Sequence, residues 1–441
     1  MQITSSYGAE IKNKNLPLHH TLVLYRQAVS YLTGVYEKAW DGLAQIPQAK
    51  SRFNAAEHLV HETKKNHARF DFDMLFPKMP SYLRRAAIQH ALGSVSSYHS
   101  RLELWNNGNL SGKPKLVCES HAMPVFYRDV MYKQGGEGED AAYLKLYDGC
   151  DWKWFRVGLL HTDMEYLRRH WTGKNSSAPV LEKRNRKYFL RFSYTEEVTL
   201  SKTPVKDQII CSVDLGINTD AVCTIMRSDG TVLGRKFIRF PSEKDRLHHV
   251  LGRIRRFQKE HGSGQTGSRW SYAKRLNTEL ARKTAGAITE YANENHADVI
   301  VFEYLEMKGK ISGKQRQKLH LWKKRDIQNM CEHKAHRHGM RIARVCAWNT
   351  SRLAYDGSGP VSRDPKNHSL CVFQTGKQYN CDLSAAYNIG SRYLMREIIK
   401  TLPETERSFL EAKVPSVKRR TSCVYADLLL LQKEYGQMRS A

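Results

Sequence analysis

The sequence of 441 residues has far fewer acidic residues than basic ones. It holds 44 Asp and Glu against 71 Lys and Arg, which leaves a formal net charge of +27 at pH 7. An excess of this size is typical of proteins that bind a polyanion, most often nucleic acid and less often an acidic membrane surface. The sequence also lacks an apolar run that could cross a membrane, and residues 1–15 lack the apolar core of a secretion signal. We therefore expect a soluble, cytoplasmic protein.

Cysteine is sparse and poorly spaced for metal binding. No two of the nine cysteines are separated by two residues, as zinc knuckles require, so we expect reduced thiols in a reducing compartment. The composition is 41% hydrophobic and 10% aromatic, which excludes a disordered basic tail for most of the length. A chain this long predicts two or three domains.

The first hundred residues predict helices. Residues 22–43 and 81–104 carry apolar side chains at spacings of three and four, which is the stripe of an amphipathic helix. Arg84 and Arg85 lie beside the second stripe. They are either an ordinary solvated helix face or a nucleic-acid contact, and the sequence leaves both open.

From about residue 113 to residue 203 the periodicity changes. Segments 142–147, 152–160 and 188–194 alternate or are rich in β-branched and aromatic residues, which predicts a small antiparallel barrel or sheet. Basic residues such as Lys187 and Arg191 are interleaved with the rings. That mixture suits stacking on bases and neutralising phosphates, and the alternative is that the rings form the barrel core.

The second half predicts an RNase H-like α/β fold. Its elements come in the order of three antiparallel strands, helices, strand, helix, strand and helix. The expected strands and helices are 209–215, 221–226, 231–238, 243–260, 270–295, 297–302, a basic helix-like stretch at 308–344, 341–347, and a helix from Asp382 to about Lys400 after a loop-rich insert.

Three carboxylates lie at the ends of these elements. Asp214 is in the first apolar strand, Glu303 ends the strand ADVIVFE, and Asp382 opens the last helix. Each has a plain alternative: Asp214 can turn outward on an edge strand, Glu303 can face water, and Asp382 can be a helix N-cap. Buried acids are unfavourable unless they are paired or hold a cation.

Taken together, the three acids predict a metal site. An RNase H-like fold brings the first strand, the fourth strand and the last helix together, and gathered carboxylates suit Mg²⁺. Two such ions about 4 Å apart activate a water and stabilise the leaving oxygen of a phosphodiester. We therefore predict Asp214, Glu303 and Asp382 as catalytic residues and magnesium ligands.

Sequence blocks resemble a known family. SVDLGIN (212–218), IVFEYLEM (300–307) and NCDLSAAYNIG (380–390) resemble the three RuvC motifs of compact type V CRISPR effector nucleases, subtype V-F, and of the transposon-encoded TnpB nucleases. Shorter blocks resemble other parts of the same proteins: KLHLWKKRDI (318–327), WNTSR (348–352), FPKMPSYLRRAAIQHAL (76–92) and KRNRKYFLRFSY (183–194). The resemblance covers about 207–400 well and the N-terminal half loosely.

The resemblance implies a multidomain α+β nuclease of prokaryotic antiviral defence. It implies a guide RNA, target double-stranded DNA, and a short flanking motif read by the protein. The implied parts are wedge domain 1–20 and 113–206, helical recognition domain 21–112, RuvC domain 207–345 and 380–441, and a target-binding insert 346–379. The candidate nucleic-acid contacts are Arg84, Arg85, Lys187, Arg191, Lys323, Lys324, Arg325 and Arg352.

One departure from the family concerns zinc. Two CxxC pairs usually occupy the insert, and here 352–357 and 372–376 carry none. Cys346, Cys371, Cys381 and His368 do not form a set with short-loop spacing. We expect no structural zinc, and an insert held by packing.

Size predicts the assembly. A chain of this length has a radius of gyration near 22 Å, hence a diameter of roughly 57 Å, whereas a guide–target duplex of about 20 base pairs approaches 70 Å. We expect two chains on one guide RNA, an asymmetric homodimer with contacts between residues 22 and 104.

The alternatives to a CRISPR effector are a TnpB nuclease guided by transposon-end RNA, a nuclease-dead repressor, or a basic RNA-binding structural protein. The last of these leaves the three acids unexplained.

Overall fold

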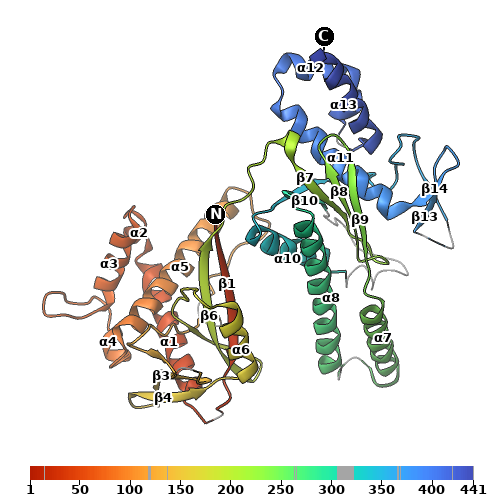
Figure 1. Cartoon of the computed structure of the whole chain (residues 1–441). Coiled ribbons are helices and arrows are strands. Elements are labelled where there is room, and N and C mark those ends of the chain that lie inside the picture. The colour runs from red at the N-terminus through yellow and green to blue at the C-terminus, as the bar shows by residue number, and fades with distance from the viewer. Residues whose placement is uncertain are drawn as a thin grey trace. The chain divides into compact units, whose positions relative to one another are not determined.

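The chain is a mixed α+β protein with two compact units in the computed structural model (Figure 1). The N-terminal unit is Gln2–Glu196, and the C-terminal unit is Glu197–Ala441 with Met1. The structure describes residues 1–13, 15–117, 121–136, 138–262, 264, 266–304, 322–364, 367, 369–419 and 421–440. Cys118, His368 and residues 305–321, which include parts of two motif blocks, lie outside the described residues. No helix in these described ranges is long and apolar enough to span a membrane.

Helices dominate the first part of the N-terminal unit. The predicted helices at 22–43 and 81–104 are confirmed in position, as α1 (Leu18–Lys38) and α5 (Ser81–Asn106), although α1 ends before residue 43. Short helices lie between them: α2 (Trp40–Ala44), α3 (Ala49–Val60) and α4 (Phe72–Leu75). The apolar stripes of α1 and α5 are buried in one shared core, as their spacing predicts.

The same unit contains two three-stranded sheets. One has the order β1 (Gln2–Glu10), β6 (Lys187–Glu197), β5 (Val180–Arg184), and the other β2 (Tyr132–Gln134), β3 (Ala141–Tyr147), β4 (Trp152–Gly158). A bridge between Ile11 and Leu159 links them, and α6 (His161–His170) follows β4. Trp152 is buried in the core of this unit, as one alternative predicts, whereas Trp154 is exposed, and stacking on bases stays a prediction for such exposed rings.

A five-stranded sheet forms the centre of the C-terminal unit. Its order is β11 (Arg341–Cys346), β10 (Val299–Tyr304), β7 (Ile209–Asp214), β8 (Ala221–Arg227), β9 (Val232–Ile238). β7, β8 and β9 are antiparallel neighbours, while β10 runs parallel to both β7 and β11. The element order predicted for this half is therefore the order found.

Helices cover both faces of this sheet (Figure 1). α11 (Cys381–Thr401) packs on one face, and α8 (Gly267–Glu294) and α10 (Lys324–Arg337) pack on the other. α7 (Pro241–His261) packs against α8. A Cβ on Gly390 would lie 2.6 Å from Met226 Sδ, so only glycine lets α11 approach the sheet this closely.

The helix-like pattern expected up to residue 344 was wrong at its end. α10 stops at Arg337, because Gly339 adopts a φ of 76° that ends the helix, and Arg341–Cys346 is then a strand. The part of that pattern at 308–321 lies outside the described residues.

The insert before α11 holds a small sheet of β12 (Ser362–Arg363), β13 (Leu370–Val372) and β14 (Gln378–Asn380). Tyr355 lies at the centre of a ring cluster beneath it. The centroid of its ring lies 5.0–6.0 Å from those of Phe373, Tyr379, Tyr387 and Tyr425. After α11 come α12 (Glu404–Lys413) and α13 (Tyr425–Ser440).

Candidate active site

Two of the predicted acids meet at the ends of parallel strands. Asp214 is the last residue of β7, and Glu303 lies near the end of β10. The strands pair with Val299 beside Ile210 and Val301 beside Ser212. Continuing that register by two residues brings Glu303 beside Asp214. Since side chains alternate along a strand, both acids lie on the face that α11 covers.

The third acid arrives from α11 itself. Asp382 is the second residue of this helix, and its carboxylate accepts a hydrogen bond from Thr219. The helix is capped by Asn380, whose side chain accepts from Leu383 N at 2.9 Å. The alternative role of Asp382 as the N-cap is thereby taken by Asn380, which leaves the Asp382 carboxylate for the site.

The three carboxylates share one electrostatic field. Burial raises the pKa of Asp214 well above its usual range, and the charges of Glu303 and Asp382 raise it further. Burial also raises the pKa of Glu303 and that of Asp382. The positive charge of Arg363 opposes the increase at Asp214 and Asp382. The charges of Glu303 and Asp382 therefore act on a carboxylate that is itself buried.

Glu303 is held by a chain of hydrogen bonds that starts on α11. It is 7% exposed, and Thr350 donates its hydroxyl to Glu303 Oε1. Asn388 Nδ2 donates to the carbonyls of Thr350 and Leu353, both at 3.0 Å. One turn later, Arg392 Nη1 donates to the carbonyls on either side of Ala347, at 2.7 and 2.8 Å. These bonds fix the turn that carries Thr350.

The loop between β7 and β8 is held just as tightly. Lys244 Nζ donates to the carbonyls of Ile217 and Asn218 at 2.9 and 2.7 Å and lies 3.0 Å from Asp220 Oδ1. A Cβ on Gly216 would lie 2.6 Å from the carbonyl of Thr219, so the turn requires glycine. The loop therefore presents the Thr219 hydroxyl to Asp382 in one defined position.

A cavity of about 400 Å³ is lined by Thr219, the hydrogen-bond partner of Asp382, and by Asn380, the N-cap of α11. Asn218, Thr219 and Arg239 line it on the strand side, and residues of the insert line it opposite. Arg239 and Arg363 both act electrostatically on Asp382. The guanidinium of Arg239 in a lining without acidic residues, with the charge of Arg363 also acting on Asp382, suits an anionic substrate such as a phosphodiester.

The donor set fits a hard divalent cation. Within the described ranges, the Asp214 carboxylate makes no hydrogen bond or ion pair, although burial of an unpaired carboxylate is strongly unfavourable. As the side chains lie, no three His, Cys, Asp or Glu residues of the described chain already form a group that could hold a metal. Mg²⁺ typically uses one or two carboxylates with water and substrate phosphate, so a complete protein cage is not required.

The predicted nucleic-acid contacts in the N-terminal unit are all near acids. Arg84 is 9% exposed, with its guanidinium 3.8 Å from Glu57 and 3.7 Å from Asp73. Arg85 is more exposed and shares Glu57. Lys187 pairs with Glu10 at 2.7 Å, and Arg191 pairs with Glu182. A contact to nucleic acid stays a prediction for each of the four.

The predicted contacts in the C-terminal unit divide by exposure. Lys323 pairs with Asp326 at 2.6 Å, and Lys324 is buried, which lowers its pKa. The charge of Lys324 acts on Glu303, so this residue belongs to the surroundings of the carboxylates. Arg325 and Arg352 are exposed.

The thiols of the insert are buried among apolar side chains. Cys371 and Cys381 are hydrogen-bonded to each other, and burial raises the pKa of Cys371 to about 12. Protonated thiols of this kind act as small apolar side chains. Together with the Tyr355 ring cluster they form the core of the insert.

Four residues of the site were not predicted from the sequence. Thr219 and Thr350 lie within or beside blocks that resemble the family, SVDLGIN and WNTSR, and that position is the only signal for them. Arg239 and Arg363 carry no sequence signal. Only the folded chain brings them to Asp382.

A sequence model of a protein family, described as the Aq_aa04 family, matches residues 5–148, a third of the chain. No curated protein matches the sequence.

Solved structures that the chain resembles include Cas12-type CRISPR effector complexes. A Cas12f1–sgRNA–target DNA complex is 16% identical, with 77% of this chain and 73% of that chain covered and a TM-score of 0.46. CasPhi-2 (Cas12j) bound to crRNA is 10% identical, with 87% and 97% covered and a TM-score of 0.46. C2c1 of Alicyclobacillus acidoterrestris with single-guide RNA is 11% identical, with 86% and 68% covered and a TM-score of 0.44.

Proposed function

We propose that this protein is an RNA-guided DNA endonuclease of a CRISPR system that cuts both DNA strands at one carboxylate site. The observation that carries the proposal is the pair Asp214 and Glu303, which lie beside each other at the ends of parallel strands and face the start of α11, where Asp382 lies. The three RuvC-like sequence blocks surround these three acids. The charge of +27 matches a polyanionic substrate and guide.

Asp214, Glu303 and Asp382 would hold two magnesium ions, which supply the Lewis acidity for phosphodiester hydrolysis. The remaining residues of the site orient the carboxylates and offset their negative charge. Thr350 fixes the rotamer of Glu303, and Thr219 fixes that of Asp382. Arg239 and Arg363 attract the phosphate to the cavity at Asp382.

The proposed domains follow from the sheets and helices of the two units. The sheet with order β11-β10-β7-β8-β9 corresponds to a RuvC nuclease core at 207–345 and 380–441, with 346–379 as its insert. Residues 1–20 and 113–206 would be the wedge barrel and 21–112 the recognition helices, and together they would read the flanking motif and bind the guide RNA. We propose no structural zinc in the insert, because its core is the Tyr355 ring cluster with Cys371 and Cys381.

The proposed assembly is two chains on one guide RNA. Within the helical part of the N-terminal unit, Met74, Leu75 and Tyr82 are exposed apolar side chains. Such side chains suit contact with a second chain. The mass of the reconstituted complex decides this point, since one 50.9 kDa chain per RNA contradicts the dimer.

A TnpB-type nuclease is the second candidate, because the same three blocks resemble that family. The RNA that copurifies with the protein separates the two: repeat-derived RNA supports the CRISPR assignment and transposon-end RNA supports the other.

The central experiment is guided cleavage of a DNA duplex by the purified protein–RNA complex with Mg²⁺. Wild type and Glu279→Gln, which changes an exposed acid on α8, should cut. Asp214→Ala should bind the duplex but leave it intact. Cleavage by Asp214→Ala at the wild-type rate would contradict the site, and failure of every variant to bind guide RNA would contradict the function.

A further inference from the structure

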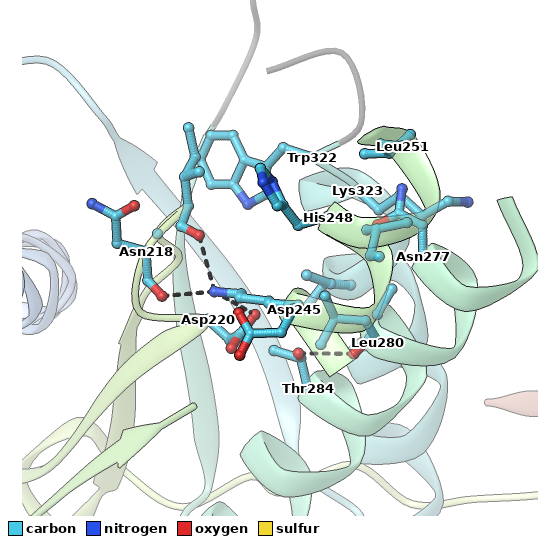
Figure 2. Close-up of a pocket in the computed structure, with 16 residues that line it drawn as sticks. Asn218, Asp220, Asp245, His248, Leu251, Asn277, Leu280, Thr284, Trp322 and Lys323 are labelled. Atoms are coloured by element: carbon cyan, nitrogen blue, oxygen red, sulfur yellow. Dashed lines mark hydrogen bonds and ion pairs between the residues drawn. The ribbon is translucent and has the colours of Figure 1, made fainter. Parts of the chain in front are cut away.

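A second cavity also borders the β7–β8 loop (Figure 2). It has a volume of about 370 Å³, within the range of about 300–1,000 Å³ that small organic ligands occupy. α7 and α8 form its sides, and Trp322, Lys323 and Ile327 close one end. Asp245 and His248 are exposed, so the cavity is open to solvent.

This cavity adjoins the carboxylate site. Asn218 lines both this cavity and the one beside Asp382. Figure 2 shows the Asn218 side chain pointing away from the centre of the α7–α8 cavity. Its neighbour Thr219 donates to Asp382, and Lys244 fixes both ends of this short connection. A chain of nucleotides with one phosphate at Asp382 is therefore within reach of the second cavity.

Most of the exposed surface of the lining is apolar, although eight of its sixteen residues carry a polar or charged side chain. Ile217, Leu251 and Leu280 supply apolar surface. The indole N–H of Trp322 is buried and has no hydrogen-bond partner within the described residues, which is unfavourable until an acceptor arrives. Figure 2 shows Trp322 and His248 at the same end of the cavity. The Asp245 carboxylate adds an acceptor at the open side.

These features match a nucleobase better than a phosphate. The ammonium of Lys244 is already neutralised by Asp220, and that of Lys323 by Asp326. Asp245 would repel an anion. A base has apolar faces for the aliphatic and aromatic walls, and it has acceptors and donors on its edge for the indole N–H and the carboxylate.

We infer that the α7–α8 cavity holds one unstacked nucleobase of the strand whose phosphate lies at the carboxylates. The inference rests on the proposed function, because it places a base of the nuclease substrate. The base anchors the strand in this cavity while the phosphate lies at the carboxylates, with Asn218 between the two. Trp322 is then a positioning residue for cleavage, with its effect on the strand rather than on the reacting atoms.

The test uses single-stranded DNA in which one nucleotide at a time is abasic, scanned across the cut position. Wild-type protein with its guide should show one sensitive position, where loss of the base lowers kcat/KM by roughly 5- to 150-fold. Trp322→Leu should lower kcat/KM on intact DNA by a similar factor, and should show no further loss with the base missing at that position. Additive losses, or no sensitive position, would overturn the inference.

Two further variants keep the test decisive. Trp322→Phe retains a ring without the N–H and should lose part of the effect, even if Trp322→Leu folds poorly. Trp270→Leu removes an indole that lies on α8 outside the cavity, and should keep the abasic pattern of wild type.

Binding separates this inference from the proposed function. Asp214→Asn protein should change the fluorescence of single-stranded DNA that contains 2-aminopurine at the sensitive position, and Trp322→Leu in the same background should abolish that change. This readout needs no cleavage. Wild type that cuts nothing contradicts the nuclease assignment, whereas an unaltered fluorescence change in the Trp322→Leu protein contradicts the base pocket.

Discussion

The two faces of the five-stranded sheet are built from the same strands and differ in kind. The face under α8 and α10 is apolar, with side chains such as Val213, Ile300 and Phe302. The face under α11 mixes apolar residues with buried polar ones, which include Ser212, Thr224 and Glu303, and α11 adds the buried Asn388 and Arg392. One face stabilises the fold by packing. The other gives up part of that stability to hold carboxylates that repel each other.

The largest effect on cleavage is expected at Glu303, which lies on the face under α11, next to Phe302 on the opposite face of β10. Glu303→Gln removes one charge of the site but keeps an acceptor for Thr350. We expect guided DNA cleavage to fall by about 10³-fold or more, with target binding retained. Cleavage kinetics and filter binding on the same preparation measure both. A loss of binding equal to the loss of cleavage would mean that Glu303 supports the fold.

Phe302→Ala tests the opposite face one residue away. The ring is fully buried between the sheet and α8 and α10, so its removal should lower the free energy of unfolding of the C-terminal unit by about 3–5 kcal/mol. Urea denaturation followed by circular dichroism measures this. At urea concentrations below the unfolding transition, the folded protein should still cut DNA. Loss of cleavage without loss of stability would contradict a purely structural role of the face under α8 and α10.

Asp214→Asn should stabilise the metal-free protein at neutral pH. Because the pKa of Asp214 is raised in the folded protein, the folded state binds the proton of this carboxyl more tightly than the unfolded state does. Protonated Asp214 therefore favours folding at pH below about 4, and this stabilisation is lost as the pH rises through the raised pKa. The asparagine does not ionise, so the difference from wild type should grow with pH to about 1–4 kcal/mol. Urea titrations with a chelator at several pH values test this. If the two proteins differ in free energy of unfolding by the same amount at every pH, the pKa of Asp214 is not raised by burial and by the neighbouring carboxylates.

Thr350→Val should have the smallest effect. It keeps the shape of the side chain but cannot hold the Glu303 carboxylate, and loss of such an outer contact at a metal site lowers activity by about 10- to 100-fold. Thr350→Ser should restore most of the rate. If valine and serine behave alike, the hydroxyl has no role in positioning Glu303.

The sequence predicted the apolar face and the strand order well, because these follow from local periodicity. The run around Val213 and the run before Glu303 are apolar enough to be buried strands, and an acid at the end of each marked them as unusual. Arg239 and Arg363 could not be predicted, because their position near Asp382 depends on β9 and the insert folding together. The small sheet β12–β14 was also missed, since its strands are too short for a periodic signal.

Asp382, Asn388 and Arg392 lie on one helix, within about 15 Å along its axis. The helix carries one acid of the site, and through Asn388 and Arg392 it also holds the turn that fixes a second acid. One helix therefore positions two of the three acids. A substitution that shifts α11 is expected to disturb Asp382 directly and Glu303 through the turn that carries Thr350, so the two acids are coupled through the backbone of α11.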